Sequence, residues 1–335
     1  MKVKNIFFAA AAAMALTACS SDDEQQSFVS QFPKDGVMRF TTNLVDPTIA
    51  TTRASITGSD VNQNGQQFQV KIVNPTSATY SYFNTVQYDG TEWTPVDRML
   101  WQNDQQSITV TAVYKQDKTF SDNEFVGGAN LTVAADQSTE AKLKQQDLLT
   151  MPTKTIANPS IEETLMRSGK LVINFYHALT KLDVTLTLNP EFYNDEIAAT
   201  DITEFTISGT NAGYTFKAMD TANENYGSVT VIASTAADIL PNQYDFTAAT
   251  ADNKYGMAKY EAIVVPQEIA AGSLTVSFKI GTRSFSWTNT QAYTLEQGKH
   301  YTLPLTVGKD GVTAGSRAFS VTSWEDQPGD NLGTE

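Results

Sequence analysis

The sequence predicts an all-β protein made of two β-sandwich domains in tandem, with few short helices. Apolar and polar residues alternate with period two in many segments, as expected of strands that bury one face and expose the other. Turns rich in Asn, Asp, Gly and Ser separate these segments, which is typical of β-sandwiches. A mature chain of about three hundred residues has room for two such domains.

Residues 1–18 are expected to be a signal peptide. Two lysines precede an apolar run over residues 6–16, which is too short for a permanent membrane span. The segment ends in LTAC, which fits a bacterial lipobox, so Cys19 is the predicted lipidation site and the first mature residue. Cys19 is also the only cysteine, which excludes a disulfide within one chain. The alternative is a free thiol in a cleaved leader.

One strand is predicted in GVMRFTTNL (residues 36–44), in the early part of the mature chain. Met38, Phe40 and Leu44 form its inward row, and more polar residues form the outward row. This alternation suits a strand that packs into a hydrophobic core.

A candidate cleavage site follows in TTRASITG (residues 51–58). Its one arginine, Arg53, is flanked by small and hydroxylated residues, and an exposed, flexible strip of this kind is what a protease needs to bind a backbone. Cleavage between Arg53 and Ala54 would separate the upstream strand from the rest of the chain. The alternative is a surface loop that happens to contain Arg53.

Residues 54–160 are expected to form the N-terminal domain. The segments QFQVKIV, WTPVDRMLW and SITVTAVY are predicted strands, and the Asp-Gly pair at 89–90 is a predicted hairpin turn. Residues 136–149 are the best candidate for a short helix, and residues 191–205 are a weaker one. The polar, proline-bearing stretch 151–163 is the predicted domain boundary.

Residues 161–335 are expected to form the C-terminal domain. The clearest alternation in the chain lies here, in LDVTLTL (182–188), LTVSFKI (274–280) and YTLPLTV (301–307). Pro304 lies on the outward row of the last segment, which favours an edge strand or a bulge there.

Composition argues against several functions. The net charge is −14 with 23 basic residues and no basic run, which disfavours nucleic acid and anionic membrane surfaces as partners. His177 and His300 are the only histidines, and His177 is expected to be a packed or turn residue. With no nucleophile, zinc or nucleotide motif present, we expect no enzyme and no cofactor. A distant carboxylate pair for glycoside hydrolysis stays open.

No metal site is expected either. DVNQNG (residues 60–65) matches the first half of a calcium-binding loop, but its twelfth position is Lys71 where a bidentate glutamate is required. We therefore interpret this segment as a polar turn.

Several segments together resemble the fimbrillin-like proteins, the subunits of lipoprotein-derived type V pili. They are the lipobox, the leader strand followed by TTRAS, DLLT (147–150), LVINFYHALTKLDVTLTL (171–188) and FSVTSWED (319–326). The F-x-H-A-L-x-K block at 175–181 is the most specific part, and the resemblance covers nearly the whole chain. It implies a fold of two transthyretin-like β-sandwich domains.

The resemblance also implies a route of assembly. The chain would be exported as a lipoprotein to the outer membrane of a Gram-negative bacterium, cut by a trypsin-like protease and polymerised with like or related pilin subunits by donor-strand exchange. It makes residues 19–53 a lipidated leader, Cys19 the lipid site and Arg53–Ala54 the bond that is cut. The strand that is removed would be 37–44.

The resemblance further makes residues 317–325 a possible donor strand for a neighbouring subunit. In this segment the alternation places Phe319 and Val321 on one face and Trp324 on the other, so a bulge or a change of register would be needed to use all three. The role of the subunit in shaft, tip or base stays open.

Two alternatives to a shaft subunit are a pilus-tip adhesin and a monomeric surface lipoprotein that binds glycan. A host surface or a glycan is therefore a further candidate partner. Trp93 and Trp101 are expected in the core, because they lie within predicted strands. Trp287 is the tryptophan most worth testing as part of a sugar-stacking platform.

Overall fold

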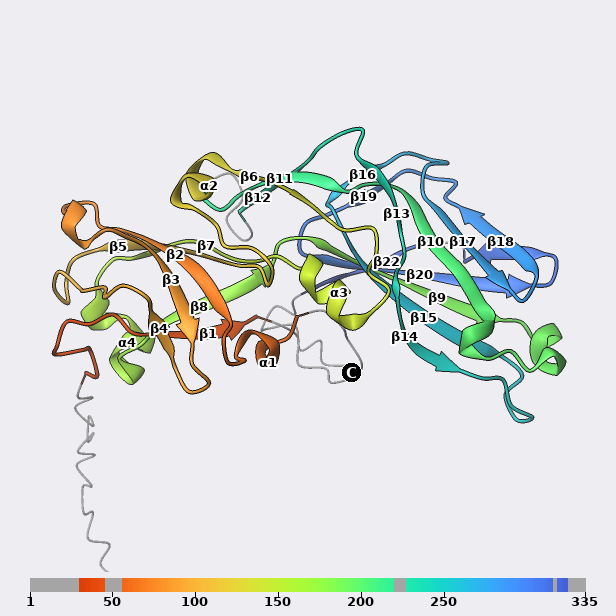
Figure 1. The fold of residues 1–335 in the computed structure, drawn as a ribbon, viewed down its shortest axis with the longest axis horizontal. Coiled ribbons are helices and arrows are strands. Elements are labelled where there is room, and N and C mark those ends of the chain that lie inside the picture. The colour runs from red at the N-terminus through yellow and green to blue at the C-terminus, as the bar shows by residue number, and fades with distance from the viewer. Residues whose placement is uncertain (1–29, 46–55, 220–226, 316–317, 325–335) are drawn as a thin grey trace, which may run out of the picture.

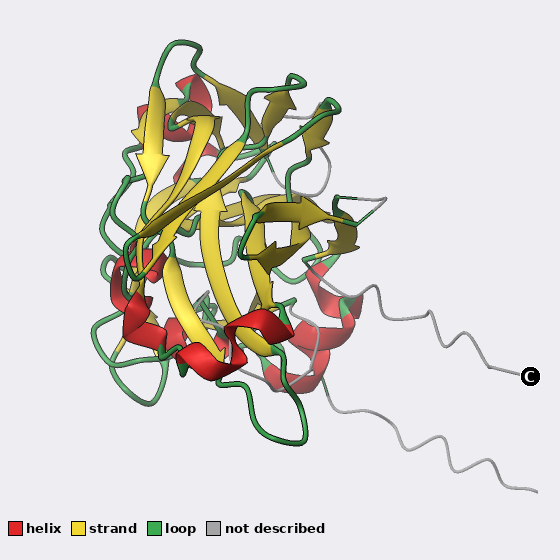
Figure 2. Ribbon diagram, turned by 90° about the vertical axis from the view of Figure 1, so that its right-hand side faces the viewer, coloured by secondary structure: helices red, strands yellow, loops and turns green. Residues whose placement is uncertain are grey.

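The computed structural model describes residues 30–45, 56–219, 227–315 and 318–324. Two lobes of β-structure lie end to end along the long axis of the molecule (Figure 1). Strands dominate both lobes, and the few helices are short and lie at their margins (Figure 2). The predicted all-β architecture of two tandem domains is confirmed.

The first lobe is a closed barrel in the order β1-β4-β3-β2-β5-β7-β8. Along β2, Phe68, Val70 and Ile72 alternate with more polar neighbours and are fully buried, as the pattern predicts. The barrel strands are β1 (Phe40–Leu44), β2 (Gln67–Val73), β3 (Tyr82–Tyr88), β4 (Trp93–Pro95), β5 (Ile108–Tyr114), β7 (Leu149–Ile156) and β8 (Leu171–His177).

The second lobe is a sandwich of two main sheets, in the orders β13-β10-β17-β18 and β14-β15-β9-β20-β21. The predicted alternation holds: Leu182, Val184 and Leu186 of β9 are fully buried in its core. The strands are β9 (Thr180–Leu188), β10 (Ile202–Asn211), β13 (Ala236–Ile239), β14 (Asn242–Thr247), β15 (Gly256–Val264), β17 (Thr275–Ile280), β18 (Arg283–Thr288), β20 (Lys299–Gly308), β21 (Gly311–Ala314) and β22 (Ser320–Ser323), with a separate pair β16 (Gln267–Ile269) and β19 (Tyr293–Leu295).

A small third sheet joins the lobes. In it β11 (Gly213–Lys217) pairs with β6 (Ala129–Thr132) from the first half of the chain and with β12 (Ser228–Val231) from the second. A separate hydrophobic cluster lies beside this sheet, and we call it the central core. It contains buried side chains from both halves, among them Phe125, Phe216 and Trp324. The lobes therefore share buried surface.

The strand pairing places the boundary between the two lobes after residue 177, whereas the sequence predicted it at residue 160. Strand β8 pairs with β1 and β7, and its Leu171, Ile173 and Phe175 lie in the core of the barrel. The polar stretch 151–163 is part of β7 and the connection to β8 instead. The chain passes to the second lobe after His177, because β9 pairs only with second-lobe strands among the residues described.

The helices are short and well capped. The predicted helix in 136–149 is confirmed as α3, with the Thr139 hydroxyl accepting from Lys142 N–H. The weaker candidate 191–205 is wrong as one helix, because two 3₁₀ turns there lead directly into β10. The helices are α1 (Gly58–Val61), α2 (Asp122–Gly127), α3 (Glu140–Gln146) and α4 (Glu163–Ser168), with 3₁₀ turns Ala78–Tyr80, Pro159–Ile161, Pro190–Asp195 and Ala199–Asp201.

Pro304 does not mark an edge strand, since β20 lies between β9 and the pair β21 and β22. On that side β22 pairs with residues 299–302 of β20 and β21 with residues 305–308. Pro304 lies between these two ladders. Its missing backbone N–H therefore costs no hydrogen bond to β21 or β22.

Candidate assembly site

Strand β1 closes the first barrel between β8 and β4. Its five residues pair in parallel with residues 171–175 of β8, and Phe40 pairs antiparallel with Trp93 of β4. The ladder continues upstream, where Met38 N–H donates to the Met99 carbonyl at 3.0 Å. The strand therefore has partners along both edges.

The inward row predicted for this strand fills the barrel core. Met38 and Phe40 are each only 1% exposed, and the Phe40 ring contacts Phe68 edge-on with 6.3 Å between ring centroids. Leu44 is half-buried and packs against the same core from the rim. Burial of each large side chain contributes about 1.5–3 kcal/mol. β1 is thus an integral core strand.

Strand β8 depends on β1 for most of its ladder. Within the described residues, positions 171–175 of β8 pair only with β1, and β7 pairs only with Tyr176 and His177. Without β1 the barrel would be open between β4 and β8, with unpaired backbone groups beside the places of Met38 and Phe40. Such an edge is a template for another strand.

The predicted lipid site and cut bond, Cys19 and Arg53–Ala54, lie outside the described residues. Downstream of the bond the chain is well anchored: Ile56 is 1% exposed, and its N–H donates to a carboxylate oxygen of Asp147 at 3.3 Å. Asp60 of α1 then pairs with Lys144 of α3 at 2.9 Å. The candidate cut therefore lies between two segments that are both fixed to the barrel.

The predicted donor segment lies on the second lobe. We call residues 318–324 the C-terminal segment. Its strand β22 pairs antiparallel with β20 through four residue pairs. Phe319 and Trp324 are buried, whereas Val321 is 50% exposed. Val321 therefore does not share the buried environment of Phe319, because β22 is the outermost strand of its sheet at this point.

Trp324 enters the central core and stacks on His177. The two rings are 4.1 Å apart at an angle of 2°, and His177 is fully buried. His177 Nδ1 lies 2.9 Å from Oδ2 of Asp147, the residue that also accepts from Ile56. The expectation of a packed histidine is confirmed. Sequence reasoning missed its partners, because both lie far from it along the chain.

A second buried polar cluster lies beside β22. Lys181 Nζ is 2.6 Å from Glu261 Oε2, and His300 Nε2 is 2.9 Å from Asp183 Oδ2. Burial alone would raise the pKa of Asp183, but the hydrogen bond with His300 and the charge of Lys181 bring it below its ordinary value. These charges are paired, so we interpret the cluster as structural.

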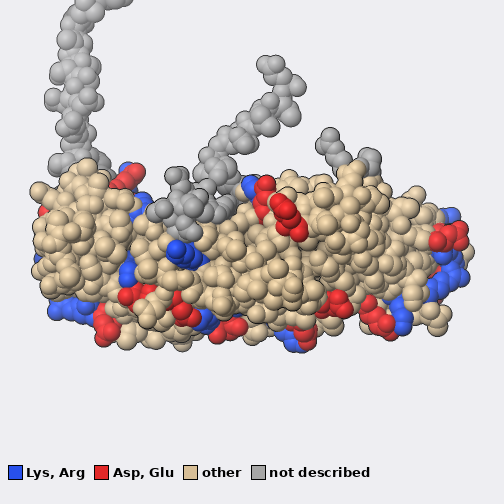
Figure 3. All heavy atoms as spheres, turned by 90° about the horizontal axis from the view of Figure 1, so that it is seen from above, with Lys and Arg blue, Asp and Glu red and all other residues tan. Residues whose placement is uncertain are grey.

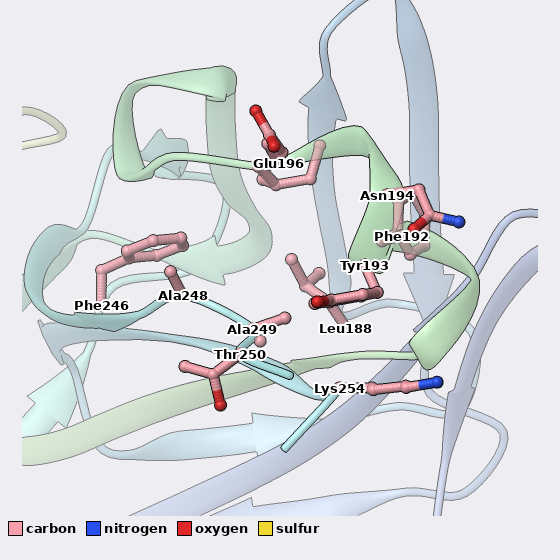
Figure 4. A pocket seen from close by; sticks show the side chains of 12 residues that line it. Leu188, Phe192, Tyr193, Asn194, Glu196, Phe246, Ala248, Ala249, Thr250 and Lys254 are labelled. Atoms are coloured by element: carbon pink, nitrogen blue, oxygen red, sulfur yellow. The ribbon is translucent and has the colours of Figure 1, made fainter. Parts of the chain in front are cut away.

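A hollow of about 370 Å³ lies at the far end of the second lobe. Figure 4 shows Tyr193 and Phe246 on opposite sides of it, with Thr250 and Glu196 at its margins. Aromatic rings with nearby polar groups can bind a small ligand such as a sugar. The hollow involves none of the predicted site residues.

Two of the tryptophans lie in the core as predicted, whereas Trp287 is less exposed than a sugar-stacking platform requires. Trp93 and Trp101 are each 5% exposed and lie in the barrel core, which confirms the prediction. Trp287 is half-buried, packs near Phe319 with 6.4 Å between ring centroids, and lines a second hollow on the second lobe. It is not a freely exposed platform.

Acidic and basic side chains are interspersed on the face shown in Figure 3, which carries no continuous basic patch. In the ranges that the structure describes, no cluster of three metal-ligating side chains is present. No helix among those residues is long and apolar enough to cross a membrane.

A sequence model of the fimbrillin-like family matches residues 52–324, and the chain therefore belongs to the fimbrillin-like family. This family comprises fimbrial subunits and adhesins of bacterial cell surfaces. No protein of curated function matches the chain.

Solved structures show the same fold. A proposed cell adhesion protein from Bacteroides uniformis is 17% identical, with a TM-score of 0.55, over 87% of this chain and 99% of that one. Another from Bacteroides ovatus is 15% identical, with a TM-score of 0.56, over 87% and 98% of the two chains.

Proposed function

We propose that this protein is a polymerising subunit of a bacterial surface pilus, with no enzymatic role. The observation that carries the proposal is the placement of β1. It is a complete core strand of the first barrel, yet it lies upstream of a candidate protease site and joins the rest of the chain only through residues 46–55. A cut there would make a core strand removable.

The route begins with export as a lipoprotein through Cys19 to the outer membrane of a Gram-negative bacterium. A trypsin-like protease then cuts between Arg53 and Ala54, and the strand at 37–44 leaves. The groove between β4 and β8 accepts a strand from another subunit, as in donor-strand complementation. The inserted strand gains about 0.5–1.5 kcal/mol for each backbone hydrogen bond, in addition to the burial of its side chains.

The C-terminal segment is the proposed donor. Among the described residues it is an edge strand, held by one ladder to β20. Phe319 and Trp324 are its large apolar side chains, and Val321 adds a third that is already exposed. Phe319 and Val321 lie on one face of the alternation and would share one row of a neighbour's groove, whereas use of Trp324 as well would require a bulge or a change of register.

The alternative is a glycan-binding surface protein, either a monomer or a tip adhesin, and the hollow beside Tyr193 and Phe246 favours it. The two proposals differ in what cleavage does. Only the pilus subunit needs Arg53 and a removable β1.

Limited trypsin digestion of the full-length, non-lipidated chain tests the proposal, followed by intact mass and a native gel. We expect one fast cut after Arg53 and then a ladder of oligomers that grows with protein concentration. Arg53→Gln should resist that cut and stay monomeric. Arg39→Gln is the matched control, because Arg39 lies in the described segment just before β1 and pairs with Asp35, and it should behave like the parent chain. A clean cut that leaves only monomer contradicts polymerisation.

A further inference from the structure

The C-terminal segment is held by two aromatic anchors with an exposed strand between them. Phe319 packs on Tyr293 of the second-lobe core, with 4.6 Å between ring centroids. Trp324, at the other end, is 1% exposed and stacks on His177. The four residues of β22 lie between Phe319 and Trp324, and each of them is at least partly exposed. The two anchors therefore supply most of the apolar contact that keeps the segment in place.

The second anchor is not on the second lobe. His177 is the last residue of β8, a strand of the first barrel, and its ring is fixed by Asp147 at 2.9 Å. The same carboxylate accepts the N–H of Ile56, the first described residue after the predicted cut. The packing of Trp324 therefore depends on the position of β8, a strand of the first lobe.

That strand is held mainly by the leader. Among the residues described, five of its seven residues pair with β1, and Tyr176 and His177 alone pair with β7. The leader ladder ends at Phe175, whose carbonyl accepts the N–H of Val45 at 3.0 Å. His177 is therefore two residues beyond the last contact with the leader, on a strand that would lose most of its ladder if β1 left.

We propose that the stack of His177 and Trp324 is a latch that keeps the C-terminal segment on its own chain while β1 is in place. The inference rests on the proposed function. With β1 present, β8 keeps the His177 ring in the position where it stacks on Trp324. Loss of β1 loosens β8, removes the stacking partner and frees the segment for a neighbouring copy. An uncut subunit is thereby prevented from donating its strand prematurely.

The latch itself is tested in the uncut chain by hydrogen exchange of the peptide covering residues 318–324. We expect Trp324→Ala to raise the exchange rate of the β22 amides at least about tenfold, because local opening sets exchange in an edge strand. Val321→Ala, in the same strand and half-exposed, is the matched control and should change the rate less than about twofold. Equal rates in both variants overturn the latch.

The coupling to the leader is tested by Phe40→Ala, which loosens β1 without cutting the chain. Ile72→Ala is the control, since Ile72 is fully buried in the same barrel on β2, away from β1 and β8. The two variants are compared under conditions where they lose the same free energy of unfolding. We then expect the exchange rate of the β22 amides to be at least about threefold higher in Phe40→Ala than in Ile72→Ala. An equal rise in both variants means global opening and overturns the coupling.

Fluorine NMR of the chain carrying 5-fluorotryptophan separates the latch from the proposed function. Trp324→Phe assigns the signal, and trypsin digestion then follows it through cleavage. We expect the Trp324 signal to move to the position of an exposed tryptophan before oligomers form. Oligomers with an unchanged Trp324 signal overturn the latch and leave the pilus function standing. A moved signal without oligomers supports the latch and contradicts polymerisation.

Discussion

The leader strand β1 and the C-terminal strand β22 are held in opposite ways. β1 pairs with β8 and β4 and buries Met38 and Phe40 in the barrel. Within the part of the chain that the structure describes, β22 pairs with β20 alone, and its own side chains are largely exposed. Departure of β1 would open the core of the barrel, whereas departure of the C-terminal segment would remove one edge strand and the two aromatic side chains Phe319 and Trp324.

This contrast separates the two kinds of control that the proposed strand exchange would need. A strand with buried side chains and two ladders is kinetically secure, so a covalent cut is a suitable trigger for its departure. A strand with one ladder is easily displaced and needs only a local restraint. The aromatic anchors Phe319 and Trp324 supply that restraint.

The largest effect is expected when the core side of β1 is truncated. Phe40→Ala should lower the free energy of unfolding of the first barrel by about 3–5 kcal/mol, because it leaves a cavity beside Phe68. Urea denaturation followed by circular dichroism measures this. Asn43→Ala, on the exposed side of the same strand, should cost less than about 1 kcal/mol. Similar losses in both variants would show that β1 is not a core strand.

Truncating the anchor of β22 should have a smaller global effect. Trp324→Ala should lower the free energy of unfolding by about 1–3 kcal/mol, because the segment can detach while both lobes stay folded. The same denaturation experiment applies, with loss of protection confined to residues 318–324. A loss as large as that of Phe40→Ala would contradict the contrast between the two strands.

The polar cluster beside β22 should make the second lobe sensitive to acid. Asp183 has a lowered pKa in the folded chain, so its contribution to stability is present above the pKa of the unfolded state and is lost as pH falls through the folded pKa. Asp183→Asn should therefore flatten the fall in stability under acid conditions. Urea titrations at pH 7 and at stepwise lower pH compare the variant with the parent. Parallel acid profiles would exclude Asp183 as a source of the sensitivity.

The smallest effect is expected at the exposed centre of β22. Val321→Ala should change the free energy of unfolding by no more than about 0.5 kcal/mol, because half of the Val321 side chain is already in water. If this residue contributes to a neighbour's groove, the same variant should still weaken oligomers formed after cleavage. Sedimentation velocity measures that difference between folding and assembly.

The sequence predicted the local features of the fold well. Alternation alone identified β1, β9 and the inward position of Phe40, because burial of one face is encoded in neighbouring residues. The family resemblance also anticipated the fold that the solved structures share.

Non-local pairings were beyond the reach of such patterns. The assignment of β8 to the first barrel depends on its pairing with β1, more than a hundred residues upstream. The contacts of His177 with Asp147 and Trp324 likewise join three distant segments. Alternation specifies which side of a strand is apolar, and it carries no information about which strand lies beside it.

The groove occupied by β1 has a further property that bears on fibre polarity. β1 is parallel to β8 and antiparallel to β4, so these two walls run in opposite directions. A replacement strand would make one parallel and one antiparallel ladder whichever way it entered. The kinds of ladder alone therefore do not distinguish the two directions of entry. In the proposed polymer, the direction would depend on which wall carries the longer ladder, now five residue pairs with β8 and one with β4, and on the side-chain positions now filled by Met38 and Phe40.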